Sequence, residues 1–403
     1  MRLSPLAPQS RRVAGVVLIS LLLALTACAS ATGNVSTGTP TATTARVAAP
    51  TATPAGPPPH AFAWTQHESS GLAQVWASVN GATPVQITHS PAPGLGPCET
   101  IITYGPPIFS PDLAHVVAIE ATAGCGDGPL YGQIAIINVA SATGTVMPGA
   151  TANPRANMRS VGWVDSNTLF YLWGGGLYTY ALGAAGPTQL PGVTNAEEAV
   201  VRGHTLFYLR SDTAGTVVTL TLHRYDLSTN TDMPNPIAMG QFSMCRCSPG
   251  DYALPGWDVS RDGAHVVFQR TTARTDQNFG AGSSLIMNAN TDGTQVTQIA
   301  EALTTTTLLR MQLSPNGRLV AFDGVIQTAP VVTASTTSSG GAGDPNYHTY
   351  SPDAAGFPVW KWDNSSFWAA SQPDDTFNPP YNGSLGYYTV GSASATVGVA
   401  GGY

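Results

Sequence analysis

The sequence has few charged residues. Asp, Glu, Lys and Arg make up 10% of the 403 residues, against roughly 25% in an average globular protein. Only 16 residues are basic, 23 are acidic, and the formal net charge is −7. Nucleic-acid binding requires clustered Lys and Arg that neutralise phosphates. The composition therefore excludes DNA and RNA from the expected partners, and the surface must consist mainly of uncharged polar residues and glycine.

Several catalytic signatures are also missing. The chain contains no G-x-S-x-G nucleophile elbow, no H-E-x-x-H zinc motif and no Asp-box of the S-x-D-x-G-x-T-W type. A non-catalytic role is therefore expected over an enzymatic one, and the sequence predicts no catalytic residue, no metal ligand and no cofactor. Long helices are improbable as well, because 43 Gly and 32 Pro favour a turn-rich β protein.

The longest apolar run lies near the N-terminus. Val13–Leu25 follows a basic segment that contains Arg11 and Arg12, and it ends in Leu25-Thr26-Ala27-Cys28. This pattern resembles the lipobox of bacterial lipoproteins, and an ordinary signal peptide is the alternative. The resemblance implies that residues 1–27 are a signal peptide and that Cys28 carries lipid such as palmitate. The expected location is extracytoplasmic, with contact to the cell membrane through this lipid only.

Residues 28–59 consist almost entirely of Ala, Thr, Ser, Gly and Pro. Such a segment cannot bury a core, so we expect a disordered linker that separates the anchor from a folded part at 60–403. Cysteines are scarce in that folded part, where the four present are Cys98, Cys125, Cys245 and Cys247. An even number in an exported protein predicts disulfides, with three pairings open. Zinc is the weaker alternative, because the spacing lacks paired C-x-x-C motifs.

One short motif recurs along the folded part. LSPNGRLVAF (313–322) matches FSPDLAHVVAI (109–119) and VSRDGAHVVFQ (259–269), and GWVDSNTLFYL (162–172) and KWDNSSFWAA (361–370) are divergent copies. Each copy predicts a strand, a tight turn and a second strand. The motif resembles the repeats of TolB-type β-propellers, relatives of the WD-repeat family.

This resemblance implies an all-β fold in which 60–403 forms a single propeller. A second predicted hairpin follows each first one, so that two hairpins make a four-stranded antiparallel blade. Seven blades are expected, and six or eight are the alternatives. The expected second strands contain Phe62, Val117, Leu169, Leu206, Val266, Leu319 and Phe367. The sequence of the first blade predicts that it lacks its innermost strand.

Propeller topology sorts the loops between two faces, and nearly all the long segments are expected on one of them. Long loops on a rigid scaffold are where binding residues usually lie. The predicted ligand-face residues are Glu99, Asp127, Asp251, Tyr252, Asp276, Phe279, Asp344, Tyr347, Asp374 and Asp375. Acidic and aromatic side chains of this kind suit a protein or cell-envelope glycan partner, or a structural calcium ion. The same sorting favours a Cys98–Cys125 disulfide, which leaves a strained Cys245–Cys247 pair.

Other conspicuous side chains are expected to serve the fold. His115 and His265 are predicted to be exposed strand starts in the repeat position of Arg318. Seven Trp on the repeat strands, Trp173 among them, are expected to pack between blades. TolB-type proteins act as interaction scaffolds, so the resemblance implies a non-catalytic binding scaffold at the cell envelope. The protein is expected to be a monomer. A carbohydrate-binding or carbohydrate-active propeller is the alternative function.

Overall fold

The computed structural model describes residues 61–67, 73–80, 82–89, 101–104, 107–123, 131–152, 160–215, 217–243, 254–270, 285–301, 309–324, 331–337, 347–350, 359–361, 364–371, 384–392 and 395–400. Contacts divide the chain into two units, Met1–Gly56 and Pro57–Tyr403, and every described residue belongs to the second. The predicted boundaries at residues 27 and 59 and the lipidation site Cys28 lie outside the described residues.

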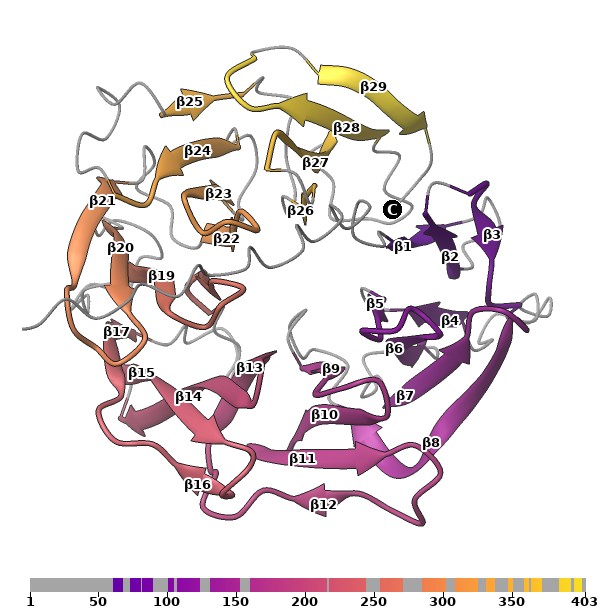
Figure 1. The fold of residues 1–403 in the computed structure, drawn as a ribbon. Helices are drawn as coiled ribbons and strands as arrows, with labels where there is room; N and C mark the ends of the chain where they lie inside the picture. The colour runs from indigo at the N-terminus through magenta and orange to yellow at the C-terminus, as the bar shows by residue number, and fades with distance from the viewer. Residues whose placement is uncertain are drawn as a thin grey trace, which may run out of the picture. The chain divides into compact units, whose positions relative to one another are not determined.

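The described part of residues 57–403 contains seven antiparallel sheets that follow one another around a ring (Figure 1). Blade 1 has three strands: β1 (Ala61–His67), β2 (Ala73–Val79) and β3 (Val85–Gln86). Blade 2 contains β4 (Ile101–Tyr104), β5 (Ile108–Phe109), β6 (His115–Ala123), β7 (Tyr131–Asn138) and β8 (Thr143–Ala152). Blade 3 contains β9 (Val161–Trp163), β10 (Thr168–Trp173), β11 (Gly176–Ala181) and β12 (Thr188–Gln189). Each sheet thus uses neighbouring segments of the sequence.

The remaining blades continue the ring. Blade 4 contains β13 (Ala196–Arg202), β14 (Thr205–Ala214), β15 (Val217–Asp226), β16 (Thr231–Asp232) and β17 (Ile237–Ser243). Blade 5 contains β18 (Trp257–Val259), β19 (His265–Arg270), β20 (Leu285–Asn290) and β21 (Thr297–Glu301). Blade 6 contains β22 (Leu309–Leu313), β23 (Leu319–Gly324), β24 (Val332–Ser335) and β25 (His348–Thr349). Blade 7 contains β26 (Val359–Trp360), β27 (Ser366–Ser371), β28 (Ser384–Thr389) and β29 (Ala395–Ala400).

The prediction of an all-β propeller with seven blades is confirmed. All seven residues expected in second strands lie there, from Phe62 in β1 to Phe367 in β27. Blade 1 contains no counterpart of the innermost strand among the described residues, as its sequence predicted. The two sheets with five strands are four-stranded blades with one interrupted edge. β4 and β5 both pair with β6, and β16 and β17 both pair with β15.

The second strand of a blade is buried on both faces because neighbouring blades cover it. In β14, Leu206 and Tyr208 belong to a cluster shared with blade 3, whereas Phe207 and Leu209 belong to one shared with blade 5. All four side chains are at most 1% exposed. This explains the continuous apolar runs in the repeat, where a half-exposed strand would alternate. The described core is therefore a series of clusters between successive blades.

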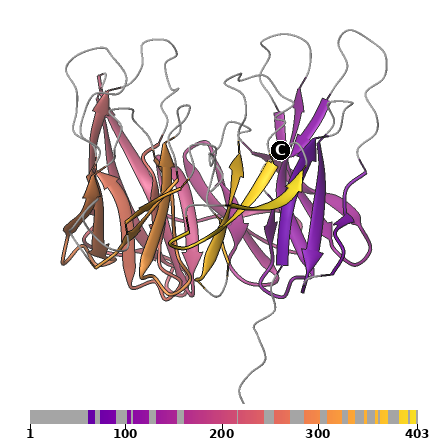
Figure 2. The same ribbon diagram turned by 90° about the horizontal axis from the view of Figure 1, so that it is seen from above.

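The repeated motif forms the same turn in blades 2, 5 and 6. In blade 5 the Ser260 hydroxyl donates to Asp262 at 2.5 Å and accepts from the His265 backbone N–H at 2.9 Å. The carboxylate of Asp262 accepts from the Ala264 N–H at 3.0 Å. The strands run along the axis of the ring (Figure 2), so these turns share one face with the other short hairpin turns. We call this side the short-turn face.

No helix long and apolar enough to cross a membrane occurs in the part of the chain that the structure describes.

Candidate functional site

Most of the predicted site lies outside the described residues. This holds for Cys98, Cys125, Cys245 and Cys247 and for every predicted ligand-face residue except Tyr347. The proposed disulfides and the grouping of acidic residues on the long-loop face therefore stay predictions. No group of three or more His, Cys, Asp or Glu side chains that could hold a metal ion occurs in the part of the chain that the structure describes.

Tyr347 lies directly before β25 and is half-buried rather than presented on a loop. Its ring packs against the apolar cluster between blades 5 and 6. Its hydroxyl is buried and has no hydrogen-bond partner among the described residues, and burial raises the pKa of this phenol. The contacts of Tyr347 with the described residues are thus contacts with the core.

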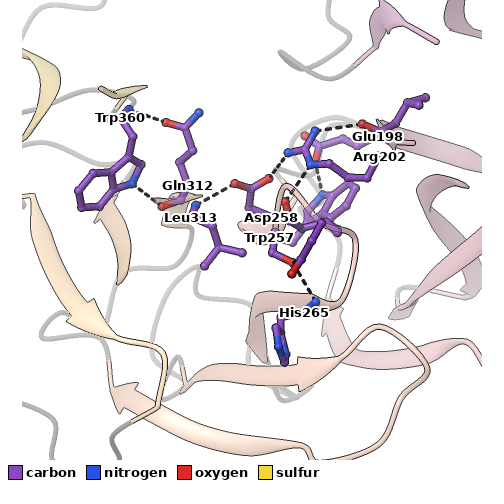
Figure 3. Close-up of polar contacts among 12 residues, drawn as sticks. Glu198, Arg202, Trp257, Asp258, His265, Gln312, Leu313 and Trp360 are labelled. Carbon is purple, nitrogen blue, oxygen red and sulfur yellow. Dashed lines mark hydrogen bonds and ion pairs between the residues drawn. The ribbon is translucent and has the colours of Figure 1, made fainter. Parts of the chain in front are cut away.

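The described polar side chains converge on the innermost strands of blades 4 to 7 (Figure 3). Asp258, in β18 of blade 5, is 3% exposed and contacts both blade 4 and blade 6. One carboxylate oxygen lies 3.3 Å from Nη2 of Arg202 in blade 4, and the other accepts the Leu313 backbone N–H of blade 6 at 2.8 Å. Burial of a charge is costly unless it is paired and hydrogen-bonded, and both conditions hold here.

The Arg202 guanidinium also donates to backbone carbonyls of blades 4 and 5. Its Nε donates to the Val259 carbonyl at 3.0 Å, and its Nη1 donates to the Val201 carbonyl at 3.1 Å. The guanidinium plane is thereby fixed against both blade 4 and blade 5, in the fork geometry that distinguishes Arg from Lys. Together with Asp258 it links three consecutive blades through side chains.

Three Trp extend the ties around the ring, because each donates its indole N–H to the preceding blade. Trp163 donates to the Ile108 carbonyl at 2.9 Å, and Trp360 donates to the Gln312 carbonyl at 2.9 Å. Trp257 donates instead to the carboxylate of Glu198 at 2.5 Å, a charge-assisted hydrogen bond. These three Trp confirm the prediction of inter-blade packing.

The polar residues of this inner network were not predicted from the sequence, although a signal is present. Ile108, Asp258 and Gln312 each lie two positions before the Ser that begins the repeated turn. Each supplies the acceptor for a neighbouring blade, through a backbone carbonyl in two cases and a carboxylate in the third. We call the contacts of Glu198, Arg202, Trp257, Asp258, Gln312 and Trp360 the inner network. It links neighbouring blades, and its Arg202 and Asp258 form an ion pair.

A second polar cluster surrounds the buried His223 on the outer strands of blade 4. His223 is 8% exposed and stacks on Tyr208 with ring centroids 5.1 Å apart. Its Nδ1 lies 3.0 Å from Asp232 and its Nε2 lies 3.0 Å from the Thr221 hydroxyl. In a neutral ring, Nδ1–H donates to the carboxylate and Nε2 accepts from the hydroxyl. Burial, followed by the charge of Asp232, raises the pKa of Tyr208. This cluster ties the short edge strand β16 to β15.

The prediction for the two repeat His was wrong in its register. His115 and His265 donate their backbone N–H to the turn Ser, as Leu319 does in blade 6, so they share the position of Leu319 rather than Arg318. His265 is exposed, as expected, whereas His115 is half-buried. The ring of His115 lies 6.2 Å from that of Trp163, and its Nδ1 has no partner among the described residues.

No family model matches the chain, and no curated protein matches it. Solved structures do match. That of oligogalacturonate lyase from Vibrio parahaemolyticus shows 13% identity and a TM-score of 0.47, covering 84% of each chain. That of a protein described as TolB from Agrobacterium tumefaciens shows 15% identity and a TM-score of 0.40, covering 67% of this chain and 90% of its own.

The tricorn protease is a third similar structure, with 8% identity and a TM-score of 0.36. The match covers 84% of this chain and 43% of the protease, so the chain spans less than half of that protein. Similarity at this level concerns the fold alone and transfers no activity. The strand pairing itself establishes the architecture: the described residues of the second unit form an all-β propeller with seven blades.

Proposed function

We propose that the protein is a lipid-anchored, extracytoplasmic β-propeller that acts as a non-catalytic binding scaffold at the cell envelope. The observation that carries this proposal is the use of the inner network. The charged groups of Asp258, Arg202 and Glu198 form ion-pair and hydrogen-bond contacts between blades. These contacts support a rigid ring that can carry a binding surface. A support of this kind suits recognition of a protein or a cell-envelope glycan.

The anchor is proposed at Cys28, after the apolar run and before the Pro- and Thr-rich linker. Lipid on this residue would hold the propeller near the membrane, while the linker gives it reach. Changing Cys28→Ser in the full chain should move the protein from the membrane fraction to the soluble fraction. Continued membrane association with unchanged signal cleavage would contradict the anchor. The Ala27→Ser variant keeps the thiol and serves as the matched control.

The partner is proposed to bind the long-loop face, opposite the short-turn face. A photo-crosslinking amino acid placed at Asp276 or Asp375 should capture an envelope component in living cells. The same amino acid at Asp262 or Asp292, in two short turns, is the control and should capture much less. Equal capture from both faces, or capture from the short turns alone, would contradict the assignment of the binding face.

A further inference from the structure

One aromatic side chain departs from the core pattern. Trp173, at the end of β10, is 50% exposed, although the sequence predicted that it would pack between blades. The connection that follows is only Gly174-Gly175, and both residues have positive φ, at 58° and 75°. Glycine adopts this conformation without steric cost, so the hairpin turns at once and leaves Trp173 at its tip. This connection joins a second to a third strand and lies opposite the short-turn face.

Trp173 belongs to an aromatic corner that the sheet register defines. Tyr171 and Tyr178 are cross-strand partners, and Trp173 is paired with Gly176, so all three rings lie on one face of blade 3. The rings of Tyr171 and Tyr178 stack at 5.2 Å, and that of Trp173 lies 6.0 Å from Tyr178 at an interplanar angle of 56°. Tyr171 is buried, Tyr178 is half-buried and Trp173 is exposed, so the aromatic corner extends from the core to the surface.

Gln189 supplies a polar group beside this corner. It is the cross-strand partner of Tyr178, on β12, and it is exposed. Its side-chain amide forms no hydrogen bond with the described residues. A Cβ added at Gly176 would lie 3.1 Å from the Gln189 amide nitrogen and 3.2 Å from a ring carbon of Tyr178. The absence of a side chain at Gly176 thus leaves room for the Gln189 amide and the Tyr178 ring to lie above the same position.

We propose that Trp173, Tyr178 and Gln189 form a binding site for one ring of a neutral glycan. The C–H bonds on one face of a pyranose form an apolar, weakly positive surface, which packs on the negative face of an aromatic ring. The exposed amide of Gln189 can donate to one sugar hydroxyl and accept from another. The three side chains are uncharged, so nothing in the set favours an acidic or a basic ligand.

The size of the surface favours a sugar ring over a protein partner. The other large apolar side chains with high exposure among the described residues are Val85, Val146 and Val296, which belong to blades 1, 2 and 5. None shares a blade with Trp173. A stable protein interface covers about 800 Å² on each partner, far more than one indole and part of a phenol. A platform of one or two rings beside one amide matches a monosaccharide unit.

This inference rests on the proposed binding role and names the ligand class for blade 3. The test uses the full chain purified in detergent and an array of neutral oligosaccharides built from glucose, mannose, galactose and N-acetylglucosamine. At least one should bind, and calorimetry gives the affinity. Trp173→Ala should weaken it at least about tenfold, and Gln189→Ala about threefold or more, because exposed aromatic anchors dominate such sites.

Two further variants separate the site from general folding. Trp173→Phe keeps an aromatic face and should bind within about threefold of the natural chain. Gly176→Ala should weaken binding while the melting temperature stays nearly unchanged, because the added Cβ displaces the Gln189 amide. Val85→Ala, at a 57% exposed position in blade 1, is the matched control and should bind normally.

The proposal is overturned if no neutral glycan binds, if only acidic glycans bind, or if Trp173→Ala binds like the natural chain. It is also overturned if a crosslinker at position 173 captures a protein and no glycan. The scaffold role is tested independently of the glycan site. If the array is negative while Asp276 or Asp375 still crosslinks to an envelope component, the glycan site is wrong and the scaffold role stands.

Discussion

The inner strands of blades 4 to 7 and the short turns of blades 2, 5 and 6 are both rich in polar contacts, but the contacts differ in range. In the turns, Ser260 bonds to residues two and five positions away. In the inner network, Asp258 bonds to Arg202 and Leu313, which are 56 and 55 positions away. The turns shape each blade, whereas the inner network holds neighbouring blades together.

The turns are therefore the features by which the fold can be recognised in the sequence, whereas the inner network stabilises the assembled ring. The turn motif is repeated because each blade must solve the same local problem of reversing a strand. The inner ties vary more than the turns: an indole and a carbonyl join blades 2 and 3 and blades 6 and 7, whereas a guanidinium–carboxylate pair and an indole–carboxylate pair join blades 4 and 5. Substitutions in the two regions should therefore differ in size.

The largest effect is expected at Asp258. Asp258→Ala removes the carboxylate that pairs with Nη2 of Arg202 and accepts the Leu313 N–H, and it should lower the free energy of unfolding by about 3 kcal/mol. Urea denaturation followed by tryptophan fluorescence measures this loss. Asp212→Ala is the matched control, because Asp212 also pairs with an Arg, at 3.1 Å, but is 52% exposed.

The control should cost less than about 0.5 kcal/mol, since exposed ion pairs are screened by water and salt. Similar losses for Asp258→Ala and Asp212→Ala would contradict the view that the inner network holds the blades together.

The indole ties come next in size. Trp257→Phe removes a donor from the Glu198 carboxylate and should cost about 2 kcal/mol, because hydrogen bonds to charged groups are the stronger class. Trp163→Phe removes a neutral bond to the Ile108 carbonyl and should cost about 1 kcal/mol. Both variants make the same change at a buried position, so the difference between their thermal unfolding compares the two hydrogen bonds. A larger loss at Trp163 would reverse the expected order.

The sequence revealed the local features of the fold and missed the distant ones. Ser110, Ser260 and Ser314 lie in segments that contain all their partners, so the turn and the blade number could be predicted. Asp258 finds its partners only after three blades are assembled. Trp173 was predicted to be packed like the other Trp, and its exposure follows from the shortening of one connection to Gly174-Gly175. The pattern of residues on its own strand does not reveal that.

A smaller effect should distinguish the turns from one another. Gly317 and Leu113 occupy equivalent turn positions with φ of 69° and 62°. Gly317→Ala should cost about 1 kcal/mol, because a Cβ is strained at positive φ. Its nearest contact would be an ordinary 3.5 Å, so conformation alone sets the cost. Leu113→Gly should be neutral or stabilising by a few tenths of a kcal/mol, since the relief of strain offsets the added chain entropy. Destabilisation by both changes would refute the equivalence of the two turns.

The smallest expected effect is a difference in acid sensitivity between blades 5 and 6. The Ser260 hydroxyl and the Ala264 N–H hold the pKa of Asp262 below its ordinary 3.8. A carboxyl whose pKa is lower in the folded state adds stability above about pH 4 and loses it as the pH falls through the folded value. Blade 6 has the uncharged Asn316 in this position, with the same contacts. Asp262→Asn should therefore lose less stability than the natural chain between pH 7 and pH 3, and Asn316→Asp should lose more. Urea denaturation at the two pH values measures both, and equal losses would mean that the turn carboxylates are not linked to folding.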